Sequence, residues 1–553
     1  MNFGRTILVA LISVAATISF SQTADIVFVN ANIRTINKSL PNAEAVAVRN
    51  GKIIAVGSNT AVRKFATGTV NVLDVKGKLL LPGFIDNHTH FMSGGFQLHN
   101  VDLRDAKNEK EFAERIREHA KKNPTLWTTG GDWDHDNWPG GNLPAKELID
   151  AFTPSTPVFV NRYDGHMALA NSYVLKLAGI TKDTPDPPGG TIVRDPVTRE
   201  ATGVLKDEAM SSVYALIPDA SEGEMTAAVK DALAEARKYG LTGIQDMSSW
   251  ADLRCYEKLR ANGELTARMY CRLPIGVVDE VIAKGIKAHS GDEMIRLGSM
   301  KAFADGSLGS STALFFEPFD SDPTTRGLAS DIVIDGRLNR WATAADKAGL
   351  QMSIHAIGDS ANSLMLDLFE RIIKANPPWD RRFRIEHAQH IAPKDFERFA
   401  KLGVIASVQP YHAIDDGRWA EGRIGHKRCA TTYAFRTFLD HRVKMCFGSD
   451  WTVAPLNPLL GIYAAVTRRT TDENNPGGWF PEQKISVQEA VEAYTINNAF
   501  AAYEENEKGT IEEGKLADFV ILSDDIFTIA PETIRNVQVE MTVLGGKIVY
   551  KKL

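Results

Sequence analysis

Apolar runs of strand length alternate with longer amphipathic stretches through the middle of this chain. The pattern is typical of a parallel sheet covered by helices, because such strands are buried on both faces. Residues 223–240 and 395–403 read as two of the helices, each ended by a glycine. The strand-length runs are LLLPGFID, LTGIQDM, RMYCRLPI, LGSMKAFA, LQMSIHAI, RFRIEHA, GVIASVQ and VKMCFGS. These eight runs predict an α/β fold of the (β/α)8 TIM-barrel type, over residues 79–505.

The two ends of the chain show short alternating strands separated by turns. Residues 22–78 contain the hairpin signal Asn50-Gly51, and residues 506–553 contain Gly545-Gly546. Because chain termini often lie close together, we expect both segments to form one composite β-sandwich domain. Residues 99–220 are too long for a barrel loop and have strand-like pieces of their own. They predict a subdomain inserted after the first barrel strand, over the barrel mouth.

Residues able to bind metal follow several of the predicted barrel strands. His88 and His90 follow the first run, and two histidines at this spacing on an extended segment point to the same side. Alone, such a pair is weak evidence for a metal site. Four later runs have polar residues able to bind metal at or just after them, Lys301, His355, His387 and Asp450. All of them fall at the face where barrels gather their catalytic groups.

This set of residue types points to hydrolysis. Imidazole and carboxylate ligands suit zinc and similar divalent ions, and an open coordination position lets the ion acidify a water molecule. Asp450 is then placed to accept the proton of that water and to pass it to a leaving nitrogen. The sequence therefore predicts a metal-dependent hydrolase that holds one or two divalent ions, with zinc preferred.

Composition narrows the class of partner. Apolar residues make up 44% of the 553 residues and charged residues 24%, which fits a globular protein with a large core. The net charge of -6 comes with no long run of one sign, so we expect a small-molecule substrate and no nucleic-acid partner. A homodimer is left open. The four cysteines form no CxxC pair, and we expect Cys271 and Cys446 to be buried thiols, with a disulfide as the alternative.

The first 22 residues differ from the rest. Arg5 precedes an apolar stretch from Ile7 to Phe20, and small residues around Ser19 and Ser21 suit a signal peptidase. The stretch has about 14 residues, short of the roughly 20 that span a bilayer. We therefore expect residues 1–21 to be a signal peptide for export to the periplasm or the medium, with no stable membrane insertion. An uncleaved anchor is the alternative.

Several longer motifs occur together along the chain. They are LLLPGFIDNHTHF, RYDGHMALANS, MKAFADGSLGSSTA, SIHAIGD, RIEHAQH, FGSDW and GTIEEGKLADFVIL. With them, the sequence resembles the amidohydrolase superfamily, and within it the YtcJ-like branch known as amidohydrolase family 3. The resemblance covers nearly all of the chain after the signal peptide. It implies that His88 and His90 hold a first ion and His355 and His387 a second, while Asp450 both binds metal and handles protons.

Lys301 matches a lysine that many relatives carboxylate so that it bridges two ions. An unmodified ammonium group would repel the cations, so this role requires carboxylation or a strongly depressed pKa. The alternative for Lys301 is a salt bridge to Asp305. Lys206, in the insertion, is a second candidate for the bridging lysine.

Four further residues are candidates for binding substrate, His166, Asp246, Gln409 and His412. His166 matches a family element and is placed to hydrogen-bond the polar end of a substrate, with a capping role as its alternative. The other three follow strands two and seven, where they line the pocket or fix a loop. We interpret His390 as a supporting partner of a metal-bound histidine.

We expect an exported amidohydrolase that cleaves a carbon–nitrogen bond other than a peptide bond. The resemblance extends to N-substituted formamide deformylases, which implies an N-formyl or N-acyl amine as substrate. Hydrolysis of a cyclic amide, lactone or ester is one alternative, because the same cage activates water for all of them. A non-catalytic regulatory or binding protein is the other.

Overall fold

A computed structural model describes residues 23–122 and 127–552. The expected signal peptide lies outside these residues. Within them, no helix is both long enough and apolar enough to cross a membrane. All four cysteines lie in the described part and are buried free thiols.

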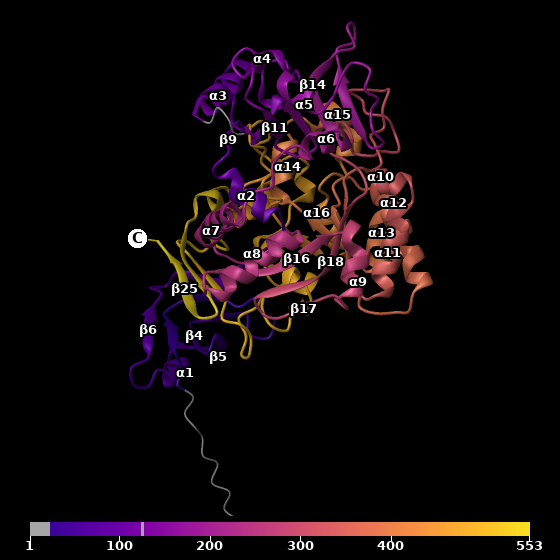
Figure 1. Cartoon of the computed structure of the whole chain (residues 1–553). Helices are drawn as coiled ribbons and strands as arrows, with labels where there is room; N and C mark the ends of the chain where they lie inside the picture. The colour runs from indigo at the N-terminus through magenta and orange to yellow at the C-terminus, as the bar shows by residue number, and fades with distance from the viewer. Residues whose placement is uncertain (1–22, 123–126, 553) are drawn as a thin grey trace, which may run out of the picture.

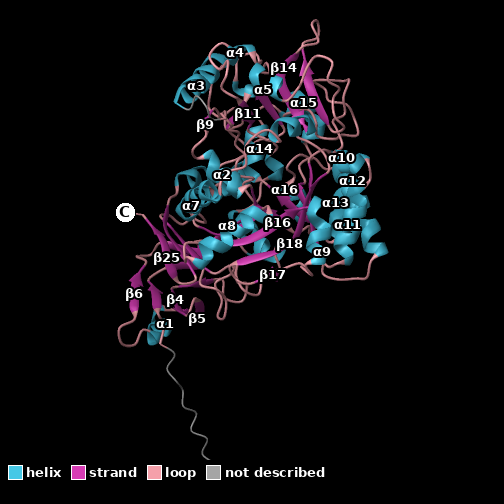
Figure 2. Ribbon diagram, viewed as in Figure 1, coloured by secondary structure: helices cyan, strands magenta, loops and turns pink. Residues whose placement is uncertain are grey.

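Eight parallel strands form a nearly closed barrel, as the apolar runs predict. Figures 1 and 2 show strands in the middle of the molecule with helices around them. In barrel order they are β8 (Phe84–Thr89), β15 (Leu241–Met247), β16 (Arg268–Pro274), β18 (Ile295–Phe303), β19 (Gln351–Ala356), β20 (Arg384–His387), β21 (Ile405–Val408) and β22 (Met445–Phe447). The first and last strands meet through a bridge between Thr89 and Trp451 and a 2.7 Å bond from the Asp450 N–H to the His88 carbonyl. The closure thus lies beside the candidate ligands.

Helices between the strands cover the outside of the barrel. The main ones are α7 (Glu222–Lys238), α8 (Trp250–Ala261), α9 (Val278–Ala283), α11 (Arg337–Lys347), α12 (Asp359–Ala375), α13 (Phe396–Leu402), α17 (Pro458–Thr467) and α18 (Val487–Tyr494). α7 and α13 confirm the two predicted helices. Ser221 and Glu224 form a capping box that starts α7, and Gly403, with a φ of 66°, ends α13.

The prediction of one barrel strand from Leu79 to Asp86 is wrong in its first half. β7 (Leu79–Pro82) pairs with β2 (Asn32–Arg34) and β23 (Phe519–Leu522) in a terminal sheet, and the chain enters the barrel only after Gly83. A Cβ at Gly83 would lie 2.2 Å from Thr242 Oγ1, so only glycine fits at this crossing. Both sheets bury the run, and hydrophobicity alone therefore does not mark the change of sheet.

The two ends of the chain form the composite β-sandwich. One sheet has the order β5-β4-β1-β6 and the other β25-β24-β23-β7-β2-β3. The remaining bounds are β1 (Ile26–Val29), β3 (Asn42–Ala43), β4 (Ala45–Arg49), β5 (Lys52–Gly57), β6 (Asn71–Asp74), β24 (Val539–Leu544) and β25 (Lys547–Lys551). Phe28 and Phe519 pack edge to face in their shared core, with ring centroids 5.7 Å apart. Asn50 and Gly51 have φ values of 51° and 76°, as a tight hairpin turn requires.

The insertion forms its own mixed sheet, β13-β14-β12-β11-β10-β9. Its strands are β9 (Val101–Asp102), β10 (Gly130–Trp133), β11 (Phe159–Arg162), β12 (Met167–Ala170), β13 (Gly190–Arg194) and β14 (Ala201–Asp207). Figure 1 shows it at the top of the molecule with α3 (Glu109–Lys122), while the terminal sheets lie at the opposite end. Asp134 and Asp136 join it to the barrel, because they pair with Arg418 and Arg423 of the barrel loops. Both aspartates also contact the buried Arg162 of β11.

Candidate metal centre

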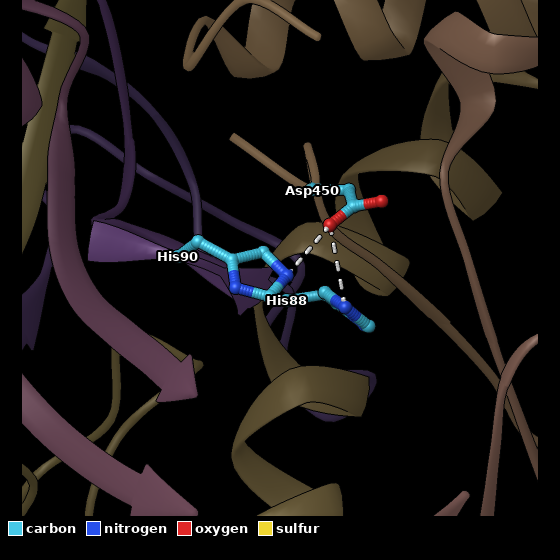
Figure 3. Close-up of side chains that lie close together, drawn as sticks. All are labelled: His88, His90 and Asp450. Carbon is cyan, nitrogen blue, oxygen red and sulfur yellow. Dashed lines mark ion pairs between the residues drawn. The ribbon is translucent and has the colours of Figure 1, made fainter. Parts of the chain in front are cut away.

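Two groups of candidate ligands converge at the carboxyl ends of the barrel strands. In the first, His88 of β8 and His90, directly after that strand, point toward Asp450, which follows β22 (Figure 3). Both Nε2 atoms lie 3.4 Å from Asp450 Oδ1. The second contains His387 at the end of β20, His412 in α14 (Pro410–Asp416) and again Asp450. Within each group the ligand atoms lie within 4.8 Å of one another. Asp450 therefore joins the two groups.

Two buried atoms in these groups make no hydrogen bond within the described residues. They are Oδ1 of Asp450 and Nε2 of His412. Nearly all buried polar atoms in folded proteins have a partner, because leaving one unpaired costs about 1–3 kcal/mol. A carboxylate oxygen and an imidazole nitrogen are both ligands of zinc-like ions. The residues present thus fit a divalent metal ion.

Glu386 fixes the orientation of His88. The Nδ1–H of His88 donates to Glu386 Oε2 at 2.5 Å, and Arg272 Nη1 donates to Glu386 Oε1 at 2.7 Å. All three side chains are at most 1% exposed. Burial lowers the pKa of His88 to about 3, so its imidazole is neutral near pH 7. With Nδ1 protonated, Nε2 offers its lone pair to a cation.

Gln409 fixes the orientation of His387, as Glu386 does for His88. Its Oε1 accepts from His387 Nδ1 at 2.8 Å, which leaves His387 Nε2 free to bind. The sequence suggested Gln409 for substrate and His390 as the supporting residue. His390 instead contacts Thr432 Oγ1 at 2.7 Å, so the structure assigns the support of His387 to Gln409.

Replacing Gln409 with leucine is expected to weaken metal binding by about 10–100-fold, because His387 would lose the partner that fixes its tautomer. Metal content measured against free-metal concentration tests this. Gln488→Leu, on the exposed face of α18, is the control. An unchanged affinity in Gln409→Leu would show that His387 does not ligate metal through Nε2.

The backbone holds two of the candidate ligands in an unusual conformation. His387 has a φ of 71° and Asp450 a φ of 57°, values that residues other than glycine seldom adopt. Asp86 helps to hold this arrangement, because its carboxylate accepts the N–H groups of both His88 and Ser449 at 3.0 Å. Such strain persists where the surrounding structure enforces it, and it concentrates at functional sites.

Asp450 is ionised despite its burial. Burial alone would raise its pKa, but His88, His90 and His387 outweigh this effect and hold the pKa well below its usual range. An ionised carboxylate that lies between two groups of histidines is suited to bind a cation and to accept a proton.

Lys301 lies among the candidate ligands. Its Nζ is 3.4 Å from His88 Nε2, and burial lowers its pKa to about 8. The alternative of a salt bridge to Asp305 is not what the structure shows, because Asp305 instead accepts the N–H groups of Ile357 and Gly358. Lys206 donates to the Ser310 carbonyl at 2.8 Å. Of the two lysines, only Lys301 is in contact with the candidate ligands in the described structure.

His355 reaches the centre with a different orientation from the one that the resemblance implies. Its ring centroid lies 4.4 Å from that of His387, but its Nε2 points to the Gly306 carbonyl at 3.0 Å. In the second ligand group its place is taken by His412, which the sequence suggested for substrate. Position after a strand brings both histidines to this face, and only the packing of the loops determines how each ring turns.

The other two residues suggested for substrate differ in their surroundings. Asp246 is fully buried and accepts from the Phe91 N–H, Ser248 Oγ and Tyr256 Oη, each at 2.7 Å, so it fixes loops and does not reach the cavity. His166 lines a small cavity together with His387, His412 and Asp450. Its Nδ1 donates to Asp207 at 2.7 Å.

A barrel with paired histidines after its first strand and an aspartate after its eighth defines a metal-binding hydrolase of the amidohydrolase type. The chain belongs to amidohydrolase family 3, whose model, described as the amidohydrolase family, matches residues 71–550. This confirms the resemblance seen in the sequence motifs.

Relatives align over nearly the whole chain. Protein LONG AFTER FAR-RED 3 of Arabidopsis thaliana is 39% identical to this chain, and the alignment covers 95% of this chain and 92% of the relative. The putative amidohydrolase YtcJ of Bacillus subtilis is 32% identical, and the alignment covers 94% of this chain and 98% of the relative. N-substituted formamide deformylase of Arthrobacter pascens is 28% identical, covering 96% and 99%. A crystal structure of an uncharacterized metal-dependent hydrolase from Pyrococcus horikoshii superposes with a TM-score of 0.74 at 27% identity, covering 92% of this chain and 99% of that chain.

Proposed function

We propose that this protein is an exported hydrolase that uses a bound divalent metal, with zinc preferred, to cleave a carbon–nitrogen bond in an N-formyl or N-acyl amine. The observation that carries the proposal is a pair of buried atoms among convergent histidines, Asp450 Oδ1 and His412 Nε2, that make no hydrogen bond within the described residues. The formamide deformylase relative supports the substrate class.

Different side chains would bind the metal, transfer the proton and hold the substrate. The candidate ligands are His88, His90, His387, His412 and Asp450. When bound, the metal would polarise the substrate carbonyl and make water more acidic. The ionised Asp450 carboxylate accepts the proton of the attacking water and delivers it to the leaving nitrogen. His166 holds the polar end of the substrate, because Asp207 fixes its ring at the edge of the cavity.

Carboxylation of Lys301 is part of the proposal. The amine would add to carbon dioxide and release a proton, which replaces a positive charge by a carbamate that can bind cations. A pKa of about 8, lowered by burial, leaves more of the amine neutral near pH 7 than an exposed lysine has. Electron density extending beyond Nζ in a crystal structure would support the modification, and density ending at Nζ would contradict it.

Export rests on the pattern of residues 1–21. Recovery of the protein outside the cytoplasm, with an N-terminus at Gln22, is the expected result in a host with a general secretion pathway. An intact N-terminus on cytoplasmic protein would contradict export without affecting the proposed chemistry.

Removing the metal is expected to abolish turnover, because the water and the carbonyl would both lose their activation. Chelation should reduce hydrolysis of formamides and N-acyl amines to background, and added zinc should restore it. His88→Ala should lose bound metal as well, whereas His99→Ala, at a side chain that is 67% exposed, should not. Full turnover in chelator by metal-free protein would refute the metal dependence. A purified protein with no bound metal, and no turnover restored by added zinc, iron or manganese, would refute the enzyme proposal and favour a regulatory role. Hydrolysis of lactones or cyclic amides but not of acyl amines would change the proposed substrate class and leave the proposed metal-dependent hydrolysis intact.

A further inference from the structure

A second, larger cavity adjoins the small one at the metal centre. Its volume is about 200 Å³, against about 40 Å³ for the inner cavity, and His166 lines both. The outer cavity is bounded by His166, Asp207, Glu208, Phe303, Ala329 and Ile332. It lies where the inserted subdomain meets the end of β18. His166 is a lining residue of both cavities, so a substrate held at Asp450 would have to extend past His166 to place its substituent in the outer cavity.

The conformation of Asp207 marks this cavity as a built site. Its φ is 47° and its ψ is -123°, a strained conformation for a residue other than glycine. One carboxylate oxygen accepts from His166 Nδ1, while Oδ2 is buried and makes no hydrogen bond within the described residues. A buried carboxylate oxygen without a donor is unfavourable, and a ligand that brings an N–H group would satisfy it.

The charges around the outer cavity favour a cation. Asp331 pairs with Arg337, and Asp305 accepts three backbone N–H groups, so neither calls for a further partner. Asp207 is balanced by His166 where that ring is protonated. Glu208 is exposed and has no ion-pair partner in the described part of the chain. The cavity therefore carries an excess of negative charge beside an apolar wall that includes Phe303 and Ile332.

We infer that the outer cavity binds the amine-side substituent of the substrate, and that it selects a short apolar chain ending in an ammonium group. The methylene groups would pack on the apolar wall, while the ammonium group would meet Glu208 and the unpaired oxygen of Asp207. The natural substrate class is then a mono-acylated diamine. This inference rests on the proposed hydrolysis of acyl amines and adds the identity of the amine.

The test compares formamides of equal length that differ in the charge at one end. They are N-formyl-1,4-diaminobutane, N-formylpentylamine and N-formyl-5-aminopentanoate, with N-methylformamide as a substrate too short to reach the outer cavity. The diamine derivative should exceed the neutral one in kcat/KM by about tenfold or more, and the acid should be the poorest, because the ammonium group would meet the buried oxygen of Asp207 as well as Glu208. Glu208→Gln should reduce the preference for the cation by about fivefold or more. Glu200→Gln, an exposed carboxylate of the same insertion, should not change it.

Binding supplies a readout that does not depend on turnover. Pentylamine, which is a cation near pH 7, should raise the Tm of the wild-type protein more than the uncharged pentan-1-ol does, and Glu208→Gln should remove the difference. The Ala329→Trp variant, in which the new side chain fills the cavity, should no longer hydrolyse the three longer substrates but should still hydrolyse N-methylformamide. Turnover of N-methylformamide with no charge preference, and no difference in Tm, would overturn this inference alone. Absence of turnover for all four formamides would overturn the proposed function and this inference with it.

Discussion

Asp450→Asn is expected to lower kcat/KM for an acyl amine by about 10³-fold or more while the fold stays intact. Asparagine has nearly the same shape, but it cannot take the proton of the attacking water, and loss of general base catalysis costs about 10²–10⁴-fold. It also removes the charge that lies 3.4 Å from both His88 and His90, so metal affinity should fall as well. Initial rates at saturating metal separate the two effects.

Asp440→Asn provides the matched control for this experiment. Asp440 ends α16 (Phe435–Asp440), is 64% exposed and pairs only with Arg436 in the described structure, so its replacement should change neither rate nor metal content. Circular dichroism and Tm should match the wild type for both variants. An Asp450→Asn protein that retains more than about a tenth of wild-type kcat at saturating metal would exclude Asp450 as the base.

Glu386→Gln is expected to destabilise the protein by about 3–5 kcal/mol, because the buried Arg272 would lose its charge partner. Both side chains are fully buried, and Nη2 of Arg272 donates to the carbonyls of Asn87 and Gln245, which carry no compensating charge. The same change removes the acceptor of His88 Nδ1–H, so metal affinity should also drop by about 10–100-fold. Denaturant unfolding of the metal-free protein isolates the effect on stability.

A double replacement distinguishes a lost charge partner from a general disturbance of the core. Glu386→Leu with Arg272→Met removes both charges and should cost less than Glu386→Gln alone, because no unpaired ion remains buried. Glu370→Gln, at an exposed pair with Lys374, should change the free energy of unfolding by less than about 1 kcal/mol. A double variant less stable than the single one would contradict this account of Glu386.

The candidate site could be predicted only in part, because sequence position defines a face and not an orientation. His88, His90, His387 and Asp450 follow apolar runs, and parallel strands deliver such positions to one end of the barrel. His412 occupies the place in the second ligand group that the resemblance implies for His355, since loop packing turns His355 Nε2 toward Gly306. Glu386 and Arg272 were missed, although a signal existed. Each is a charged residue within an apolar strand, which is expensive unless the two are paired.

The sequence by itself determined the alternation of strands and helices, the hairpins at both ends and the residues that follow each strand, because periodicity and turn chemistry act over a few neighbouring positions. The tertiary structure decided where β7 leaves the barrel, which histidine nitrogens are free to bind, and how the outer cavity forms beside β18. Each of these depends on contacts between residues far apart in the chain, such as His88 with Glu386 and His166 with Asp207. Local patterns carry no information about such pairs until the chain has folded.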